Sequence, residues 1–263
     1  MPRVSIAALR DTIARIEAAG VSFGQESNKV PLGHAGADAA LAGGIAPGAL
    51  HEIYADERDS VSASAFAAML ALRIARAHSF ILWVRQDFTP QQCGQLSAQG
   101  LFDLGIDPDR LLFVKTRNGA EAMRAASDAF SCKALGAIVL EVWRQPKSLD
   151  LVASRKFTLR AGASGITIFL IRIAAADAMP STAETRWFVR AAATPDFVED
   201  WGNPLFEATL ARNRHGQTGA WAMEWNCDAR VFGEIPQNSR ARLSGAHGGP
   251  HQAEPQTSRR SAG

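Results

Sequence analysis

The feature that most constrains this fold is a series of short, almost uninterrupted apolar runs that alternate with helix-forming stretches. The runs lie at residues 50–54, 80–84, 111–114, 137–140 and 166–171. Strands that are apolar on both faces are typical of a parallel sheet, because the helices of the crossover connections cover both sides. The intervening stretches predict helices over about 61–77, 90–104, 120–130 and 149–161. The sequence therefore predicts an α/β protein with a mostly parallel sheet flanked by helices.

The last third of the chain changes character. Residues 186–190 predict a further strand, and 205–212 and 219–225 flank a turn at 213–216, which predicts a C-terminal β-hairpin. In its second strand three large side chains alternate with smaller or charged residues and so share one face of the sheet. They are Trp221, Met223 and Trp225. This face is either part of the core or a surface on which bases or a partner could stack.

Both ends of the chain read differently from its centre. Within residues 1–30, an amphipathic helix is expected over 4–18, and its apolar face packs on its own domain or docks on a partner or neighbouring subunit. Residues 31–232 are expected to form the domain. From Gly233 to Gly263 the chain is rich in Pro, Gln, Ser, Arg, Gly and His, which predicts a disordered tail.

Composition excludes several classes of protein. A formal net charge of +2 is compatible with nucleic-acid binding but does not establish it. The cysteines are three, far apart and without a Cys-x-x-Cys pair, so neither a disulfide framework nor a zinc site is expected. No run approaches the roughly 20 apolar residues that span a bilayer, and no signal peptide is recognised. We therefore expect a cytoplasmic protein without a bound metal.

The turn after the first strand is where an α/β protein of this pattern would hold a phosphate. Residues 55–62 contain neither the glycines nor the lysine that a phosphate loop needs, and only Ser62 offers a hydroxyl for magnesium. The acidic residues of this turn are Asp56, Glu57 and Asp59. The segment is therefore expected to be a solvated turn in which Asp59 or Ser60 caps the next helix, and no cofactor is expected.

Several segments resemble the RecA superfamily in their order along the chain. Residues 45–54 resemble the strand that leads into the RecA phosphate loop, and 81–84 resemble the second RecA strand. Residues 104–111 resemble the Leu-Gly-x-Asp segment before the third strand, and 137–141 resemble the strand that ends in a magnesium-orienting acid. The resemblance implies a RecA-like P-loop-type core.

Within this superfamily the chain is most similar to the ImuA family, the damage-inducible mutagenesis proteins that bacteria encode beside ImuB and an error-prone DNA polymerase. Residues 210–221, with Glu224 and Trp225, carry this closer match, and the resemblance covers about 31–232. It implies that most of the RecA nucleotide site is lost. Val61 takes the place of the lysine, and Arg172 that of the nucleotide-sensing glutamine. The remaining equivalents are Ala55 and Ser60 for the loop glycines, Glu141 for the magnesium-orienting acid, and Arg85 or Gln86 for the catalytic glutamate.

Basic residues are numerous in and beside the part where RecA proteins hold DNA. They are Arg144, Lys147, Arg155, Lys156, Arg160, Arg172, Arg186 and Arg190, with Arg212, Arg214 and His215 at the turn of the hairpin. Such side chains neutralise phosphates without reading sequence, although exposed Lys and Arg are also commonly just solvated. We assign Arg155, Lys156, Arg172, Arg212 and Arg214 as the candidates for contact with DNA or a protein partner.

The resemblance implies a non-catalytic accessory factor in SOS-induced mutagenesis and translesion DNA synthesis. Its expected partners are an ImuB-like polymerase-related protein, RecA and error-prone polymerase components, with DNA as a further candidate. A different class is represented by SulA-like inhibitors of cell division, which also resemble RecA without a working ATP site and bind the tubulin-like division protein. A third alternative is an ATPase with an unorthodox phosphate site, whose turnover would depend on Glu141.

Overall fold

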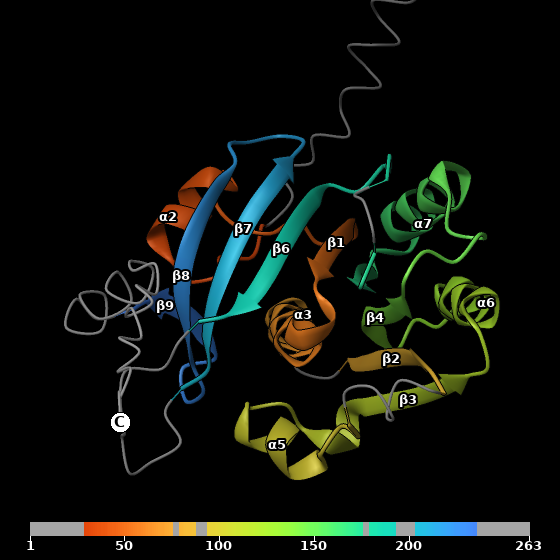
Figure 1. Cartoon of the computed structure of the whole chain (residues 1–263), viewed down its shortest axis with the longest axis horizontal. Coiled ribbons are helices and arrows are strands. Elements are labelled where there is room, and N and C mark those ends of the chain that lie inside the picture. Colours follow the sequence, from red (N-terminus) through yellow and green to blue (C-terminus); the bar gives the residue numbers. More distant parts are fainter. Residues whose placement is uncertain (1–28, 76–78, 88–93, 176–178, 193–202, 236–263) are drawn as a thin grey trace, which may run out of the picture.

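A nine-stranded mixed sheet with helices on both faces forms the protein in the computed structural model (Figure 1). The structure describes residues 29–75, 79–87, 94–175, 179–192 and 203–235. The helix expected over 4–18, Cys93 and the tail from residue 236 onward lie outside these ranges.

The strands follow the order β3-β2-β4-β5-β1-β6-β7-β8-β9 across the sheet. From β3 to β6 all neighbours are parallel, and from β6 to β9 they are antiparallel. The α/β prediction with a mostly parallel, helix-flanked sheet is thus confirmed. The strands are β1 (Leu50–Ala55), β2 (Phe80–Gln86), β3 (Leu111–Thr116), β4 (Leu135–Trp143), β5 (Thr167–Ile173), β6 (Thr185–Ala191), β7 (Leu205–Asn213), β8 (Gly219–Asn226) and β9 (Val231–Glu234).

Local signals in the sequence set the helix boundaries. The side chains of Asn118 and Asp150 accept hydrogen bonds from the backbone N–H of the third residue that follows, so each caps a helix N-terminus. Gly165 ends the second of these helices in the left-handed conformation, with φ of 76°. The helices are α2 (Ala35–Ala40), α3 (Ser60–Ile74), α5 (Ala98–Asp103), α6 (Gly119–Ala129) and α7 (Leu151–Ser164), with short 3-10 turns η2 (Glu57–Asp59) and η3 (Pro108–Arg110).

One predicted helix is much shorter than expected. The stretch 90–104 was predicted to be helical, but α5 begins only at Ala98, where the Ser97 side chain accepts a hydrogen bond from the Gly100 N–H. Residues 94–97 have no helical structure, and 88–93 are outside the described ranges. A serine N-cap stops a helix from extending backwards, because the cap residue itself has extended backbone angles.

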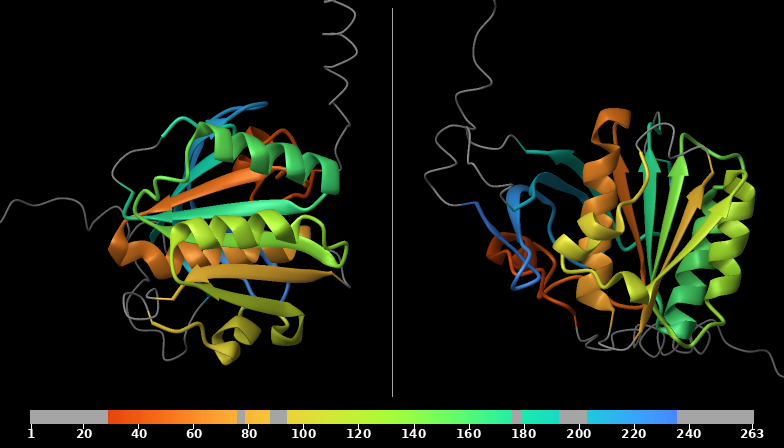
Figure 2. Two further views of the ribbon diagram at one scale, coloured as in Figure 1. Left: turned by 90° about the vertical axis from the view of Figure 1, so that its right-hand side faces the viewer. Right: turned by 90° about the horizontal axis from the view of Figure 1, so that it is seen from below.

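Helix α3 is the centre of the core on one face of the sheet. It is apolar on nearly all sides, which is typical of a fully buried helix. The ring of Phe66 lies 5.1–5.6 Å from those of Trp187, Phe206 and Phe232, so α3 packs on the antiparallel strands as well as the parallel ones. Helices α6 and α7 cover the opposite face of the parallel part (Figure 2).

The antiparallel strands extend the core further than the sequence indicated. Met223 and Trp225 of β8 are fully buried and Trp221 is partly buried, so the core interpretation of these residues is correct. Beyond the paired β7 and β8, strand β9 contains Gly233 and Glu234, which had been assigned to the disordered tail. The boundary was misplaced because buried Phe232 anchors this last short strand against Trp225, a contact between two strands.

Candidate functional site

The connection from β1 to α3 is a short turn. Strand β1 ends at Ala55, the turn η2 follows at once, and α3 begins at Ser60. Asp59 holds this turn in place, because its Oδ1 accepts a hydrogen bond of 3.1 Å from the N–H of Ala191 at the end of β6. Asp59 occupies the N-cap position of α3, as one alternative predicted, but its side chain makes no capping hydrogen bond there. It links the turn to β6 instead.

The side chains of this turn offer few groups that could bind a phosphate. Val61, which the RecA resemblance places at the lysine position, is 61% exposed and carries no charge, while Ser60 is buried and Ser62 partly buried. Asp56 and Glu57 are exposed on the preceding residues. Their negative charges oppose the approach of a polyphosphate.

Glu141, the candidate magnesium-orienting acid, lies inside the protein beneath α3. It is fully buried and forms an ion pair with Arg85 of β2, whose Nε is 3.0 Å from Oε2 and whose Nη2 is 3.2 Å from Oε1. Oε2 also accepts hydrogen bonds from Trp83 Nε1 at 3.2 Å and from Ser64 Oγ at 3.4 Å. Both carboxylate oxygens therefore have partners from the protein itself. In the part of the chain that the structure describes, no group of three or more His, Cys, Asp or Glu side chains could hold a metal ion.

Arg85, the partner of Glu141, lies at a position that the RecA resemblance singled out. The RecA resemblance placed the catalytic glutamate near Arg85 or Gln86, and the structure puts the guanidinium of Arg85 against the remaining acid. Gln86 points elsewhere, since its Oε1 accepts a hydrogen bond from the Trp143 N–H. The two positions at which the RecA resemblance expects carboxylates therefore hold side chains of opposite charge that form an ion pair.

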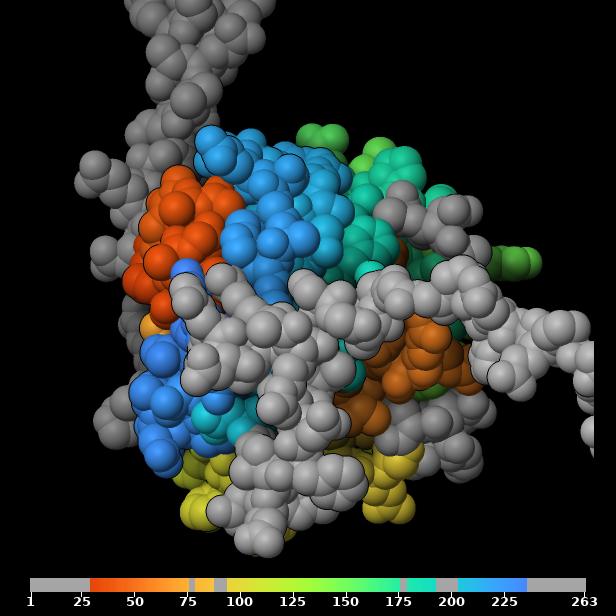
Figure 3. All heavy atoms as spheres, turned by 60° about the vertical axis from the view of Figure 1, so that its left-hand side comes forward, coloured from red at the N-terminus to blue at the C-terminus, as the bar shows by residue number. Residues whose placement is uncertain are grey.

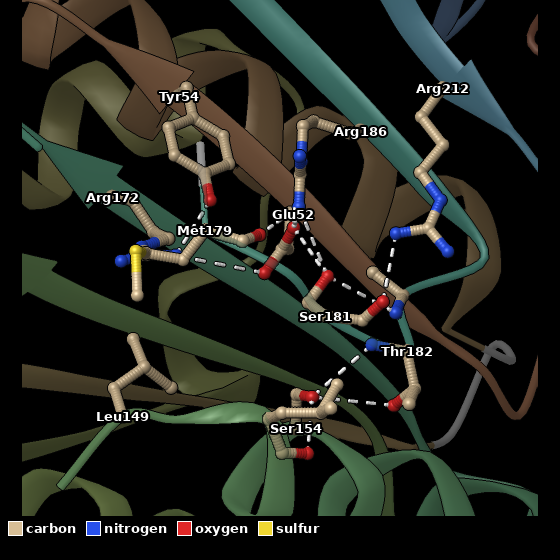
Figure 4. A network of polar contacts seen from close by, with 12 residues as sticks. Glu52, Tyr54, Leu149, Ser154, Arg172, Met179, Ser181, Thr182, Arg186 and Arg212 are labelled. Carbon is tan, nitrogen blue, oxygen red and sulfur yellow. Dashed lines mark hydrogen bonds and ion pairs between the residues drawn. The ribbon is translucent and has the colours of Figure 1, made fainter. Parts of the chain in front are cut away.

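A second buried network lies on the opposite face of the sheet, around Glu52 of β1 (Figure 4). Oε2 of Glu52 accepts hydrogen bonds from Arg186 of β6 at 2.8 and 3.0 Å and from Ser181 Oγ at 2.9 Å. Nη1 of Arg172, on β5, is 3.9 Å from Oε1. The three strands are neighbours in the sheet, so their aligned positions bring two guanidinium groups to one carboxylate.

Tyr54 completes this network. Its hydroxyl accepts a hydrogen bond of 2.6 Å from Arg172 Nη1, and the guanidinium carbons of Arg172 and Arg186 lie 5.0 and 5.3 Å from the centre of its ring. Burial, followed by the charge of Glu52, raises the pKa of Tyr54 above its ordinary value. Arg172 also donates to Gln145 Oε1.

These contacts correct one sequence prediction. Arg172 was a candidate for contact with DNA or a partner, but it is 2% exposed and its guanidinium is engaged within the protein. The sequence contained the signal that could have revealed this, because charged residues stand in otherwise apolar strands at Glu52 and Arg172. A charge in such a run must find a partner inside the protein.

The two arginines of β7 and its turn support the segment that enters β6. Arg212 Nη1 donates to the carbonyl of Ser181 at 2.8 Å, and Arg214 Nε donates to that of Ala183 at 3.2 Å. Burial, followed by the charge of Arg214, lowers the pKa of Arg212. Arg214 is exposed directly after β7. On the face shown in Figure 3, the antiparallel strands lie beside α2. Contact of either arginine with DNA or a partner stays a prediction.

Arg155 and Lys156, the other candidates for contact with DNA or a partner, lie on the outside of the protein. Both are exposed on α7, and neither forms an ion pair with any residue in the described ranges. They are available to a ligand, whereas Arg172 is not.

The chain is similar to Protein ImuA of Caulobacter vibrioides. Proteins of this name from two strains are each 26% identical to it over 197 residues, which is 69% of this chain and 77% of the relative. No protein-family model matches the chain. The similarity supports the resemblance to the ImuA family that the motifs indicated. Among the helices that the structure describes, none is long and apolar enough to cross a membrane.

Proposed function

We propose that this chain is a RecA-like accessory factor in SOS-induced mutagenesis and translesion DNA synthesis, and that it acts by binding other molecules without catalysing a reaction. The similarity to Protein ImuA supports the process. The segments that resemble RecA become parallel strands of one sheet, which supports the proposed relationship of the core.

The observation that carries the proposal is the ion pair of Glu141 and Arg85. An acid that orients magnesium must offer a free oxygen to the metal or to its water. Both oxygens of Glu141 are held by protein donors under α3, and the charge of Arg85 cancels its own. The acidic turn before α3 adds repulsion where a triphosphate would lie. Together these features argue against ATP hydrolysis at this site.

A protein that acts without chemistry must act through its contacts. The proposed partners are an ImuB-like polymerase-related protein, RecA and components of an error-prone DNA polymerase. DNA is a further candidate ligand, with Arg155 and Lys156 as exposed cations that could meet phosphates.

Equilibrium binding of labelled ATP, with and without single-stranded DNA, tests the absence of a nucleotide site. We expect no saturable binding by the wild-type chain. Ser62→Ala is the matched variant, because Ser62 is the hydroxyl in the turn that could hold magnesium. Saturable binding that this variant loses would contradict the proposal and favour a nucleotide-controlled protein.

The process is tested in cells that carry the gene. Deletion is expected to lower the frequency of mutations induced by DNA damage, and the wild-type gene is expected to restore it. The tagged protein should co-purify from damaged cells with an ImuB-like protein or RecA. If overexpression instead makes cells filament and deletion leaves mutagenesis unchanged, the SulA-like alternative is favoured.

A further inference from the structure

Exposed apolar side chains gather on the outer face of α7. Leu151, Val152 and Leu159 are 50%, 60% and 64% exposed, although large apolar residues are normally covered. The helix already has a buried side, formed by Ser154, Phe157 and Ala161, that packs on the sheet. In Figure 2, α7 runs along the outside of the sheet, and no described element covers it. These apolar side chains are therefore not needed for the contact of α7 with its own sheet.

The same face carries positive charge. Residues four apart lie above one another on a helix, so Leu151, Arg155 and Leu159 form one row, with Val152 and Lys156 in the row beside it. We call these five residues the α7 surface. Arg160 follows Lys156 in this second row, and its guanidinium donates to Ser127 of α6. The exposed cations Arg155 and Lys156 therefore lie between the apolar side chains of Leu151, Val152 and Leu159. Residues 151–164 contain no acidic side chain, and Asp150, just before the helix, is used as its N-cap.

We propose that the α7 surface binds an acidic amphipathic helix of a partner protein. This rests on the proposed function, because it identifies the surface through which a non-catalytic accessory factor would make its contacts. Leu151 and Leu159 are eight residues apart, which is about 12 Å along a helix. A partner helix with apolar residues at that spacing and carboxylates between them would match the apolar and the basic parts together.

Two other occupants match the surface less well. A second copy packed about a twofold axis would place Arg155 and Lys156 against the same residues of its neighbour, and α7 has no carboxylate to neutralise them. DNA would satisfy the two cations, but phosphate contacts give no role to three exposed apolar side chains around them. A partner that is both apolar and acidic uses every residue of the α7 surface.

Fluorescence anisotropy with the purified full-length chain tests this proposal. The probe is a labelled alanine-based helical peptide of about 20 residues, long enough to form a helix. It carries leucines at i, i+1 and i+8 and glutamates at i+4 and i+5. The comparison probes are the same peptide with lysines in place of the glutamates, and a single-stranded oligonucleotide. Measurements at two salt concentrations separate the charge contribution.

The variants remove the two halves of the surface separately. Leu151→Ser with Leu159→Ser is expected to weaken binding of the glutamate peptide at least about tenfold, as loss of interface anchors does. Arg155→Glu with Lys156→Glu is expected to abolish it and to create binding of the lysine peptide. The matched controls are Phe102→Ser, an equally exposed apolar residue on α5, and Lys133→Glu, an exposed cation elsewhere. Both controls should bind the glutamate peptide like wild type.

Three outcomes would overturn the proposal. The first is that the wild-type chain does not bind the glutamate peptide, and the second is that the charge-reversed chain binds it equally well. The third is that the oligonucleotide binds through Arg155 and Lys156 and that the Leu151→Ser, Leu159→Ser variant binds the oligonucleotide as tightly as wild type. The α7 surface would then be a DNA-binding surface. The deletion experiment in cells is independent of all three. If the peptide binds but deletion does not change induced mutagenesis, the α7 surface is supported and the proposed process is contradicted. If deletion lowers induced mutagenesis but the peptide does not bind, the process is supported and the α7 surface is contradicted.

Discussion

Replacement of Glu141 by leucine should destabilise the protein strongly, because it removes the carboxylate that pairs with the buried guanidinium of Arg85. Arg85 is buried in β2, and its guanidinium contacts both carboxylate oxygens of Glu141. Removal of one member of a buried ion pair typically costs about 3–5 kcal/mol. We therefore expect Glu141→Leu to lower the free energy of unfolding by about that amount.

The double variant Arg85→Met with Glu141→Leu should recover part of this loss. An apolar pair of similar size removes both charges. The cost of burying the two charges is then absent, as is the attraction between them. The hydrogen bonds from Trp83 Nε1 and Ser64 Oγ to Glu141 are still lost, and a buried donor without an acceptor costs about 1–3 kcal/mol. Urea unfolding followed by tryptophan fluorescence at neutral pH measures all three proteins and completes a double-mutant cycle.

The same variants show whether Glu141 serves only the stability of the protein or also its function. If Glu141→Leu alone costs less than about 1 kcal/mol, well below the range for a broken buried pair, the reasoning from the ion pair is refuted. If the double variant folds well but cannot restore damage-induced mutagenesis, Glu141 has a role beyond stability. We expect the folded double variant to restore it.

Three smaller effects follow from the same structure. Burial lowers the pKa of His51 to about 4, whereas in the unfolded chain it is near 6.5, so acid favours the unfolded chain. Lowering the pH from 7 to 5 should therefore reduce the free energy of unfolding by about 2 kcal/mol. In urea titrations His51→Gln should lose less stability over this pH range. An identical pH dependence in both proteins would contradict this. Gly44→Ala should cost about 2 kcal/mol in the same assay, because φ is +130° and a Cβ would lie 2.3 Å from the Val30 carbonyl oxygen. Asp150→Ala should cost about 1 kcal/mol through loss of the α7 cap, and an unchanged unfolding midpoint would count against that cap.

Much of the fold could be predicted from the sequence by itself. Runs such as 80–84 and 137–140 are apolar at every position and short, which favours strands covered on both faces of a sheet. The helix caps at Asn118 and Asp150 are likewise local, because a cap side chain reaches only the next turn of the chain. The acidic turn without glycine or lysine, and hence the doubt about a phosphate site, was also determined by the sequence.

Tertiary structure alone decided which charges are available. Arg85 and Glu141 are 56 residues apart, and they meet because β2 and β4 are neighbours in the sheet, an order that no local pattern specifies. Arg172 and Arg155 looked alike in the sequence as candidate cations, yet one is enclosed by β1 and β6 and the other lies open on α7. The physical reason is that burial depends on contacts between distant segments, whereas the type of an element depends on its own period of apolar residues.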